Sequence, residues 1–482
     1  MNNILNSELT KKLESYFFTF LLFELFLGGS GRIFSFGFVS LRMVLFSIAL
    51  IWFSIRFLYE SKDKFIFRVV IYFTFILVTG VIVGHLNNAP KNLIFIDIKQ
   101  LLFFFSIICF SICIKTKEQI KKVITTIKIS TIILAISYLI CYSLIQLNII
   151  EMKPFYNCLS VKWLHNEFMF RGMDGNFFYK GFFYLGIGIF FFLFSKPSFK
   201  NGLITLIIYV ALFLTLLRWL LAITIIVFAS SIFFNWAINK FKLAYLKSKE
   251  MVFHLLLILT MTITPIIFKD FYITSLGNKQ ESVDIRKQQI EEVKSEIFEN
   301  KNSLTLEKKK EIKPLNDKNI KNINNITLKD TTLEKLNNNI KNLKDLETEK
   351  SNSDIKNLKY KTKEKSKFNI LVGKGLGIGV PIRPVHMELT YLEIFFKQGL
   401  LGLSFWLFIL LYCIYKFKLA IKNKIDLNDI LPWLTGVFIV YLQSITNPLL
   451  VNSIGMSFVI IAMIILRNQA LITQNHTELS NN

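Results

Sequence analysis

The sequence predicts an all-α polytopic membrane protein with about 12 transmembrane helices, and three observations lead to this fold class. First, 53% of the 482 residues are hydrophobic, and 49 residues are phenylalanine. Second, the apolar residues fall in stretches of roughly 18 to 25, the length that a helix needs to cross about 30 Å of hydrocarbon. Third, these stretches are continuously apolar, whereas strands of an outer-membrane barrel alternate in polarity. A soluble, collagen-like or disulfide-stapled protein is excluded.

Each apolar stretch is expected to form one spanning helix. With boundaries placed to within about four residues, the expected spans are 15–29, 38–58, 65–84, 93–114, 123–149, 177–195, 201–217, 219–239, 251–268, 392–415, 428–446 and 449–466. Only Arg218 separates the seventh span from the eighth, so this pair is the hardest to resolve.

The distribution of positive charge predicts the orientation, because lysine and arginine are enriched in cytoplasmic loops. With the N-terminus taken as cytoplasmic, the segments on that side hold 21 basic residues, and the short loops on the other side hold six. The alternation holds at every expected cytoplasmic loop, and a wrong number of spans would shift its parity. Both termini are therefore predicted to be cytoplasmic, with the loops 150–176 and 269–391 on the outer side.

Three parts are expected along the chain. Residues 1–268 hold nine helices and the outer loop 150–176, residues 269–391 form a large outer loop, and residues 392–482 hold the last three helices and a short cytoplasmic tail. Within the large loop, 300–367 is a low-complexity insert rich in lysine and asparagine, without glycine, cysteine or tryptophan. Its partial 3-4-3 spacing of leucine and isoleucine indicates a weakly amphipathic helix on a solvated tract, to which we assign no chemistry.

The net charge of +24 reflects membrane topology rather than nucleic-acid binding. Between Lys279 and Lys367 there are 22 basic and 16 acidic residues, so that stretch carries only +6. The remaining excess lies mainly in short loops, where lysine and arginine set orientation. The cysteines are Cys109, Cys113, Cys141, Cys158 and Cys413. Because four of them lie in apolar stretches, they provide no disulfide framework and no CxxC metal pair.

Ionisable residues inside or at the ends of spans are costly, so each is a functional candidate. Arg218 stands in FLTLLRWLLAITII at an outer boundary, with no acidic residue nearby in the sequence. Its guanidinium can snorkel to headgroups as an anchor, or it can make a bidentate phosphate contact, which we favour. Asp97 and Lys99 are expected to be a boundary pair or anchors, and Arg42 and Lys128 to be structural.

The first outer loop ends in a polar turn beside a span. Arg171 is followed by Gly172 and, after Met173, by Asp174, Gly175 and Asn176, which places these side chains at the membrane surface. A plain turn and helix cap explains residues 174–176 equally well.

The second outer loop opens with Ser282, Asp284 and Arg286, a pattern typical of a helix start. Beyond the insert, glycines fall at Gly373, Gly375, Gly377 and Gly379. This spacing is GxGxGxG rather than GxGxxG and follows no strand of a βαβ unit, so a dinucleotide site is not expected. Such a loop at a membrane surface lets backbone N–H groups approach an anion.

Arg383, His386 and Glu388 follow the glycines directly before the tenth expected span. Histidine and glutamate are common general bases, and here they face the outer compartment beside a hydrophobic helix. The alternative is that they are interfacial polar residues that cap the helix.

Taken in order, these segments resemble those of the superfamily of O-antigen polymerases and O-antigen ligases, which are bacterial inner-membrane glycosyltransferases. The matching segments are the RG…DGN turn at 171–176, the arginine of LLRWLL at 218, SVDIR at 282–286, GKGLGIG at 373–379, HMELTYLEIFFKQGLLG at 386–402 and NPLL at 447–450. The resemblance covers nearly the whole chain except the insert at 300–367.

The resemblance implies a GT-C-like, multi-pass enzyme of the inner membrane whose active site is periplasmic. Its donor and acceptor would be undecaprenyl-pyrophosphate-linked oligosaccharides, without a metal or another cofactor. Besides the lipid bilayer, a chain-length regulator and a flippase of the same pathway would be its partners. Arg218 and Arg286 match arginines of the family and would bind the pyrophosphate leaving group, with Arg171 and Arg383 assisting.

One departure from the family pattern bears on the reaction. The ligase signature places a histidine eleven residues before a G-x-x-G pair, and here Glu388 stands eleven residues before Gly399 of the Gly399–Gly402 pair. His386 lies thirteen residues before that glycine. This favours a Wzy-type polymerase over a ligase that transfers glycan to lipid A-core, and it leaves open whether His386 or Glu388 is the base.

A lipid-linked oligosaccharide flippase, which is not an enzyme, is a further alternative. It would predict two related halves with polar residues at the middle of the membrane. The chain shows no internal repeat, and its polar candidates collect at one face. The enzyme is therefore favoured.

Overall fold

The computed structural model describes residues 8–29, 31, 35–36, 39–60, 63–158, 167–171, 176–195, 198–239, 263–264, 280–298 and 368–480. The chain divides into two units, Met1–Lys294 with Phe368–Asn482 as the first and Ser295–Lys367 as the second. The insert at 300–367 lies outside the described residues, as does the expected span at 251–268 apart from 263–264.

Helices and short strand pairs make up the amino-terminal part of the first unit. In chain order they are α2 (Glu8–Leu27), β1 (Ser35–Phe36), β2 (Val39–Ser40), α3 (Leu41–Glu60), α4 (Lys64–Leu86), α5 (Lys91–Leu101), η1 (Leu102–Phe105), α6 (Ser106–Cys113), α7 (Lys117–Gln146), α8 (Met152–Asn157), β3 (Phe168–Arg171) and β4 (Asn176–Tyr179). β1 pairs with β2 and β3 pairs with β4, both antiparallel.

The remaining described elements are helical. They are η3 (Lys180–Phe182), α9 (Phe183–Leu193), α10 (Phe199–Leu214), α11 (Arg218–Asn239), α14 (Gln280–Phe298), α16 (Thr390–Lys422), α17 (Leu427–Gln443) and α18 (Ser453–Ser480). Every expected span other than 251–268 overlaps a described helix, α5, η1 and α6 together forming the fourth. The expected span 177–195 begins in β4 and η3, and α9 covers only Phe183–Leu193 of it.

Six of the described helical stretches are long and apolar enough to cross a membrane. These are Leu41–Tyr59, Lys64–Leu86, Lys91–Cys113, Lys117–Gln146, Thr390–Lys422 and Ser453–Ala470. Three shorter stretches, Lys180–Leu193, Phe199–Leu214 and Arg218–Ser230, are also apolar. The predicted fold class, an all-α polytopic membrane protein, is confirmed, and the number of about 12 spans stays a prediction.

Local sequence signals explain where several helices begin. Asp63 accepts hydrogen bonds from the backbone N–H groups of Phe65 and Ile66 at 3.1 and 3.2 Å, and this caps α4. Thr116 and Gln119 form a capping box at the start of α7. These bonds satisfy N–H groups that have no partner within the first turn.

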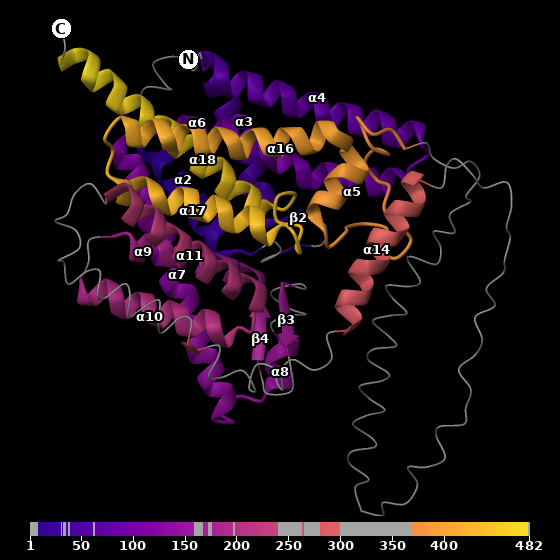
Figure 1. The fold of residues 1–482 in the computed structure, drawn as a ribbon, viewed down its shortest axis with the longest axis horizontal. Helices are drawn as coiled ribbons and strands as arrows, with labels where there is room; N and C mark the ends of the chain where they lie inside the picture. Colours follow the sequence, from indigo (N-terminus) through magenta and orange to yellow (C-terminus); the bar gives the residue numbers. More distant parts are fainter. Residues whose placement is uncertain are drawn as a thin grey trace, which may run out of the picture. The chain divides into compact units, whose positions relative to one another are not determined.

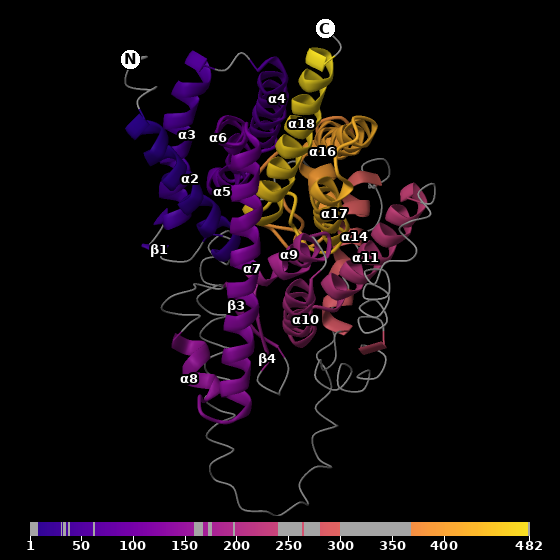
Figure 2. The ribbon, with the colours of Figure 1, turned by 90° about the vertical axis from the view of Figure 1, so that its left-hand side faces the viewer.

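Packing separates helices of the interior from helices at the periphery. Every residue of α9 is buried, and this helix contacts α7, α10, α11 and α17; α7 also contacts α2 and α10 (Figure 2). In contrast, α4 exposes one apolar face, and the side chains on it, each about half exposed, are Phe67, Ile71, Phe75, Val78 and Ile82. Such a face suits a hydrocarbon solvent better than water.

Arg42 joins three helices at a buried position. Its Nε lies 2.9 Å from a carboxylate oxygen of Glu24 on α2, and its Nη1 donates to the carbonyl of Gly29 and to Oγ of Ser453, the first residue of α18. The side chains of Arg42 and Glu24 are only 5% and 7% exposed. A pair buried this deeply needs both partners, because removing one leaves an uncompensated charge.

Replacing Arg42 with methionine is therefore expected to destabilise the protein by about 3–5 kcal/mol. The measurement is the thermal unfolding midpoint of the purified protein in detergent. Lys12→Met is the control, because Lys12 pairs with Glu8 at an exposed site, where an ion pair contributes at most about 1 kcal/mol. Equal midpoints for the two variants would contradict a structural role for Arg42.

Candidate functional site

The site is built around a break in helix α16. Gly399 has φ +62° and ψ −156° inside this helix, so the helical hydrogen bonding stops there and resumes beyond it. The N–H groups of Leu400 and Leu401 donate instead to the carbonyls of Ile370 and Leu371, at 2.9 and 3.1 Å. Irregular backbone is tolerated at membrane depth only where protein groups satisfy it, and here the segment before the helix does so.

The glycine loop, residues 373–379, packs against α16 at this break. The N–H groups of Lys374 and Gly375 donate to the carbonyls of Phe396 and Lys397, at 2.8 and 3.0 Å, and the N–H of Leu376 donates to the carbonyl of Gly80 on α4. Figure 1 shows this loop in orange between α4, α5 and the start of α16. The loop thus caps the first half of the broken helix and fastens it to α4.

Close packing explains why glycines are needed here. Gly373, Gly375 and Gly377 all have positive φ, and a Cβ on Gly375 would lie 2.0 Å from the backbone nitrogen of Gly84. A Cβ on Gly379 would lie 2.2 Å from the carbonyl oxygen of Pro384. The sequence interpretation was that these N–H groups approach an anion. The N–H groups of residues 374–377 instead donate to acceptors of the protein, so we assign the glycines a packing role.

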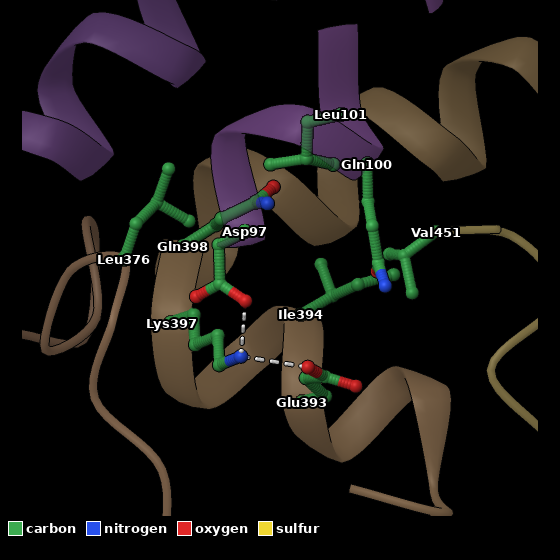
Figure 3. A pocket seen from close by; sticks show the side chains of 9 residues that line it. All are labelled: Asp97, Gln100, Leu101, Leu376, Glu393, Ile394, Lys397, Gln398 and Val451. Atoms are coloured by element: carbon green, nitrogen blue, oxygen red, sulfur yellow. Dashed lines mark hydrogen bonds and ion pairs between the residues drawn. The ribbon is translucent and has the colours of Figure 1, made fainter. Parts of the chain in front are cut away.

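Three buried charged side chains, Asp97, Glu393 and Lys397, lie together next to the loop (Figure 3). With His386, which borders them, we call them the inner cluster. The ammonium of Lys397 contacts Oδ1 of Asp97 at 2.8 Å, Oε1 of Glu393 at 2.7 Å and the carbonyl of Val385 at 2.8 Å. These three bonds use all three ammonium protons. The side chains of Lys397, Asp97 and Glu393 are 4%, 6% and 5% exposed.

Asp97 also holds the glycine loop. Its Oδ2 accepts a hydrogen bond of 2.7 Å from the backbone N–H of Gly377. The sequence predicts a boundary pair or anchors for Asp97 and Lys99. The structure instead pairs Asp97 with Lys397, which is 300 residues away in the chain.

His386 sits at the edge of the inner cluster with its side chain 29% exposed. Its Nδ1 lies 3.4 Å from Oε1 of Glu393 and 3.9 Å from Oδ1 of Asp97. Its Nε2 lies 2.9 Å from the amide nitrogen of Gln100, one turn after Asp97 on α5. Nδ1 therefore faces two carboxylates, and Nε2 faces an amide.

The inner cluster also bears on the question of a metal. One atom each of Asp97, His386 and Glu393 can be chosen so that all lie within 4.8 Å of one another, a spacing that one ion could bridge. However, the Lys397 ammonium already contacts both carboxylates at hydrogen-bond distance. It supplies the positive charge that these acids need, so we assign no metal to them.

A second group of charges, Arg286, Arg383 and Glu388, lies on the exposed side, and we call it the outer cluster. Nε of Arg286 contacts Oε2 of Glu388 at 3.0 Å, and Nη2 of Arg383 contacts Oε1 at 3.0 Å. All three side chains are between 26% and 44% exposed. Two arginines thus share one carboxylate, which leaves a net charge of +1.

Helix α14 carries Arg286, and the same face of the helix packs against the segment that contains Arg383 and Glu388. One turn after Arg286, Gln289 is fully buried, and its side-chain oxygen accepts the backbone N–H of Glu388 at 3.2 Å. Glu292 accepts the backbone N–H of Ile382 at 3.1 Å. The spacing of three residues places these side chains on one face of α14.

The other two predicted arginines lie on separate elements. Arg218 is the first residue of α11, and its neighbour Trp219 donates an indole N–H to the carbonyl of Leu442 near the end of α17. Four residues after α17, the carbonyl of Asn447 accepts a hydrogen bond from Thr390, the first residue of α16. Arg171 ends β3, opposite Asn176 in β4, and residues 172–175 of this turn lie outside the described residues.

Sequence reasoning singled out His386, Glu388, Arg286 and Arg383, but not the residues that support them. It gave no role to Glu393 and Lys397. A signal for both was present, because two ionisable residues four positions apart inside an expected span face the same side of a helix. Gln100 carried no such signal.

These features define a class: a polytopic helical membrane protein in which a buried ionic cluster and surface-facing arginines meet at a broken helix. The chain is similar to an O-antigen polymerase from Shigella flexneri, with 31% identity over 223 residues, which are 44% of this chain and 55% of that protein. The chain thus spans about half the length of this curated relative. No family model and no solved structure matches the chain. The match confirms the resemblance to O-antigen polymerases.

The packing role of the glycine loop can be tested with Gly375→Ala. The positive φ alone costs about 1–3 kcal/mol for a residue with a side chain, and the Cβ would overlap the backbone of α4. We expect a lower thermal unfolding midpoint in detergent. Ile370→Ala, at an exposed position of the same segment, is the control. A G375A midpoint equal to that of the wild type would refute tight packing here.

Proposed function

We propose that this protein polymerises undecaprenyl-pyrophosphate-linked oligosaccharide repeat units into O-antigen or a related surface polysaccharide, on the periplasmic face of the bacterial inner membrane. The proposal rests mainly on the closeness of the two clusters. His386 of the inner cluster stands only two residues before Glu388 of the outer cluster. Arginines suit a diphosphate leaving group, and a histidine suits deprotonation of a sugar hydroxyl. The similarity to an O-antigen polymerase supports the substrate class.

The proposed reaction is a single displacement at a sugar carbon. A hydroxyl oxygen of the acceptor attacks the anomeric carbon of the donor glycan, and its proton passes to a base of the protein. The bond between the anomeric carbon and the phosphate oxygen breaks, and its electron pair stays on the pyrophosphate. Arg286 and Arg383 neutralise that developing charge, and Arg218 and Arg171, on separate elements, are further candidates.

The geometry favours His386 over Glu388 as the base. Both carboxylate oxygens of Glu388 are held by arginines at 3.0 Å, so this carboxylate serves to hold the two guanidinium groups together. When a diphosphate binds, it would replace Glu388 as the partner of the arginines. His386, in contrast, keeps one ring nitrogen on an amide that an acceptor hydroxyl can displace.

Two further parts of the proposal concern cation chemistry and orientation. The guanidinium groups supply the fixed positive charge that a metal ion supplies in other transferases, so the proposed reaction is metal-independent. The carboxyl end of α18 and the orange loop with α14 lie on opposite sides of the first unit (Figure 1). This supports a cytoplasmic C-terminus with the site on the periplasmic side. A flippase and a chain-length regulator of the same pathway are the proposed protein partners.

Arg286→Ala and Arg218→Ala should each lower chain extension by about 10²–10³-fold, because each removes a fixed charge from the leaving-group site. The measurement is polymer formation from lipid-linked repeat units by protein in proteoliposomes, with membrane content checked by immunoblot. Lys287→Ala is the matched control, since Lys287 is exposed and adjacent to Arg286 on α14. Normal extension by both arginine variants would show that neither binds the leaving group.

A strain that lacks the protein separates polymerase from ligase. Lipid A-core capped by one repeat unit, without a ladder on a lipopolysaccharide gel, is the expected result. Bare lipid A-core with accumulation of long lipid-linked chains would instead indicate a ligase. An unchanged ladder would redirect the search to other surface glycans and then to the flippase.

A further inference from the structure

We propose that Glu393 is a positioning residue that fixes the tautomer of His386, so that the proton is on Nδ1 and the lone pair of Nε2 is directed toward the acceptor hydroxyl. This inference rests on the proposed function, because it assigns the geometry of the base in that reaction. Its physical basis is the arrangement of the inner cluster, and its main test does not require catalysis.

The positions of the acids decide which nitrogen carries the proton. Oε1 of Glu393 lies 3.4 Å from Nδ1, and Oδ1 of Asp97 lies 3.9 Å from the same nitrogen. A carboxylate accepts hydrogen bonds and cannot donate them when ionised, so the ring nitrogen that faces these oxygens is the one that carries hydrogen. A neutral imidazole then has its lone pair on Nε2.

Gln100 completes this assignment from the other side of the ring. Its side-chain nitrogen lies 2.9 Å from Nε2, and an amide NH₂ group donates to an unprotonated ring nitrogen. The amide thus occupies the position beside Nε2 that a hydroxyl donor of the acceptor would take. An acceptor hydroxyl that displaces it would present its own O–H to the same lone pair.

Glu393 can act in this way because Lys397 and Asp97 hold it in place. Lys397 stands four residues after Glu393 on α16, and its ammonium binds Oε1 at 2.7 Å while it also binds Asp97 on α5. Glu393 is 4% exposed, and its second oxygen, Oε2, is buried with no hydrogen-bond partner within the described part of the chain. A buried carboxylate with one oxygen left unbonded is costly, which suggests a function beyond stability.

In the proposed reaction, the proton of the acceptor hydroxyl moves to His386. The acceptor O–H bond breaks as the new bond from oxygen to the anomeric carbon forms, and the proton moves to Nε2 of His386. The imidazolium keeps its Nδ1–H on the carboxylate of Glu393, which stabilises the new positive charge. The electron pair of the broken glycosidic bond leaves with the pyrophosphate, and the imidazolium later releases its proton to water. The charged groups that face the ring are Asp97 from α5 and Glu393 from α16, and Lys397 of α16 pairs with both acids.

The first experiment is nitrogen NMR of the full-length protein in detergent or bilayers, labelled with ¹⁵N-histidine. His386→Gln identifies the ring signals of His386. We expect the neutral ring in the wild-type protein to show a protonated Nδ1 and an unprotonated Nε2. Glu393→Gln should shift the population toward the other tautomer, whereas Glu388→Gln, two residues from the ring but paired with arginines, should leave it unchanged. A wild-type ring with its proton on Nε2 would overturn the proposal.

Gln100→Glu provides a second variant that leaves Asp97, Glu393 and Lys397 intact. It places a carboxylate opposite Nε2, so this nitrogen should become protonated and unable to act as a base. In the proteoliposome assay, both Q100E and E393Q are expected to lower kcat by about 10²–10⁴-fold, with a KM for the lipid-linked donor that changes far less. Q100E protein with a protonated Nε2 and wild-type kcat would contradict the assignment even if E393Q does not fold.

The outcomes also separate this inference from the proposed function. If R286A lacks activity while H386Q and E393Q keep wild-type kcat, the function stands and the His386 geometry is wrong. If the wild-type protein shows no polymer formation but the NMR tautomers are as expected, the geometry stands and the function is wrong. Activity that is lost with EDTA and restored by Mn²⁺ in the wild type, together with Mn²⁺ binding that E393Q abolishes, would overturn the role given to Glu393.

Discussion

The ion contacts of Lys397 are the interaction on which the rest of the site depends. An ammonium inside a membrane-spanning helix is costly unless it is fully paired, and this one spends its three protons on Asp97, Glu393 and the carbonyl of Val385. These partners come from α5, from the preceding turn of α16 and from the segment after the glycine loop. One side chain therefore holds together α5 with Gln100, α16 with Glu393, and the segment that carries His386 and Glu388.

The break at Gly399 makes this arrangement possible. A continuous helix would satisfy its own backbone and leave no groups for the segment 369–377 to bind. Because α16 stops and restarts, its free carbonyls and N–H groups recruit that segment, whose glycines pass close to α4. The same segment leads directly into Arg383, His386 and Glu388. The broken helix thus positions the charged residues, as backbone breaks do where they line a site in membrane proteins.

Much of the fold could be predicted from the sequence because spanning helices are local features, determined by runs of apolar residues. The site was less accessible. His386, Glu388 and the arginines were identifiable by residue type, but Asp97 was taken for a boundary residue because its partner lies 300 positions away. The glycines suggested an anion site because the acceptors of the N–H groups of residues 374–377 lie on α4, α5 and α16, far from the loop in the linear sequence.

The two clusters together create a local field that suits the proposed transfer. With neutral His386, the inner cluster has two carboxylates and one ammonium, so it carries a charge of −1 where a base would gain a proton. The outer cluster has two guanidinium groups and one carboxylate, so it carries +1 where a leaving pyrophosphate would gain negative charge. These fixed charges would therefore favour both the proton that the base gains and the negative charge that the leaving group gains. Fixed charges placed in this way lower the barrier without reorganisation, which makes the ordering of these few side chains more important than the strength of any single contact.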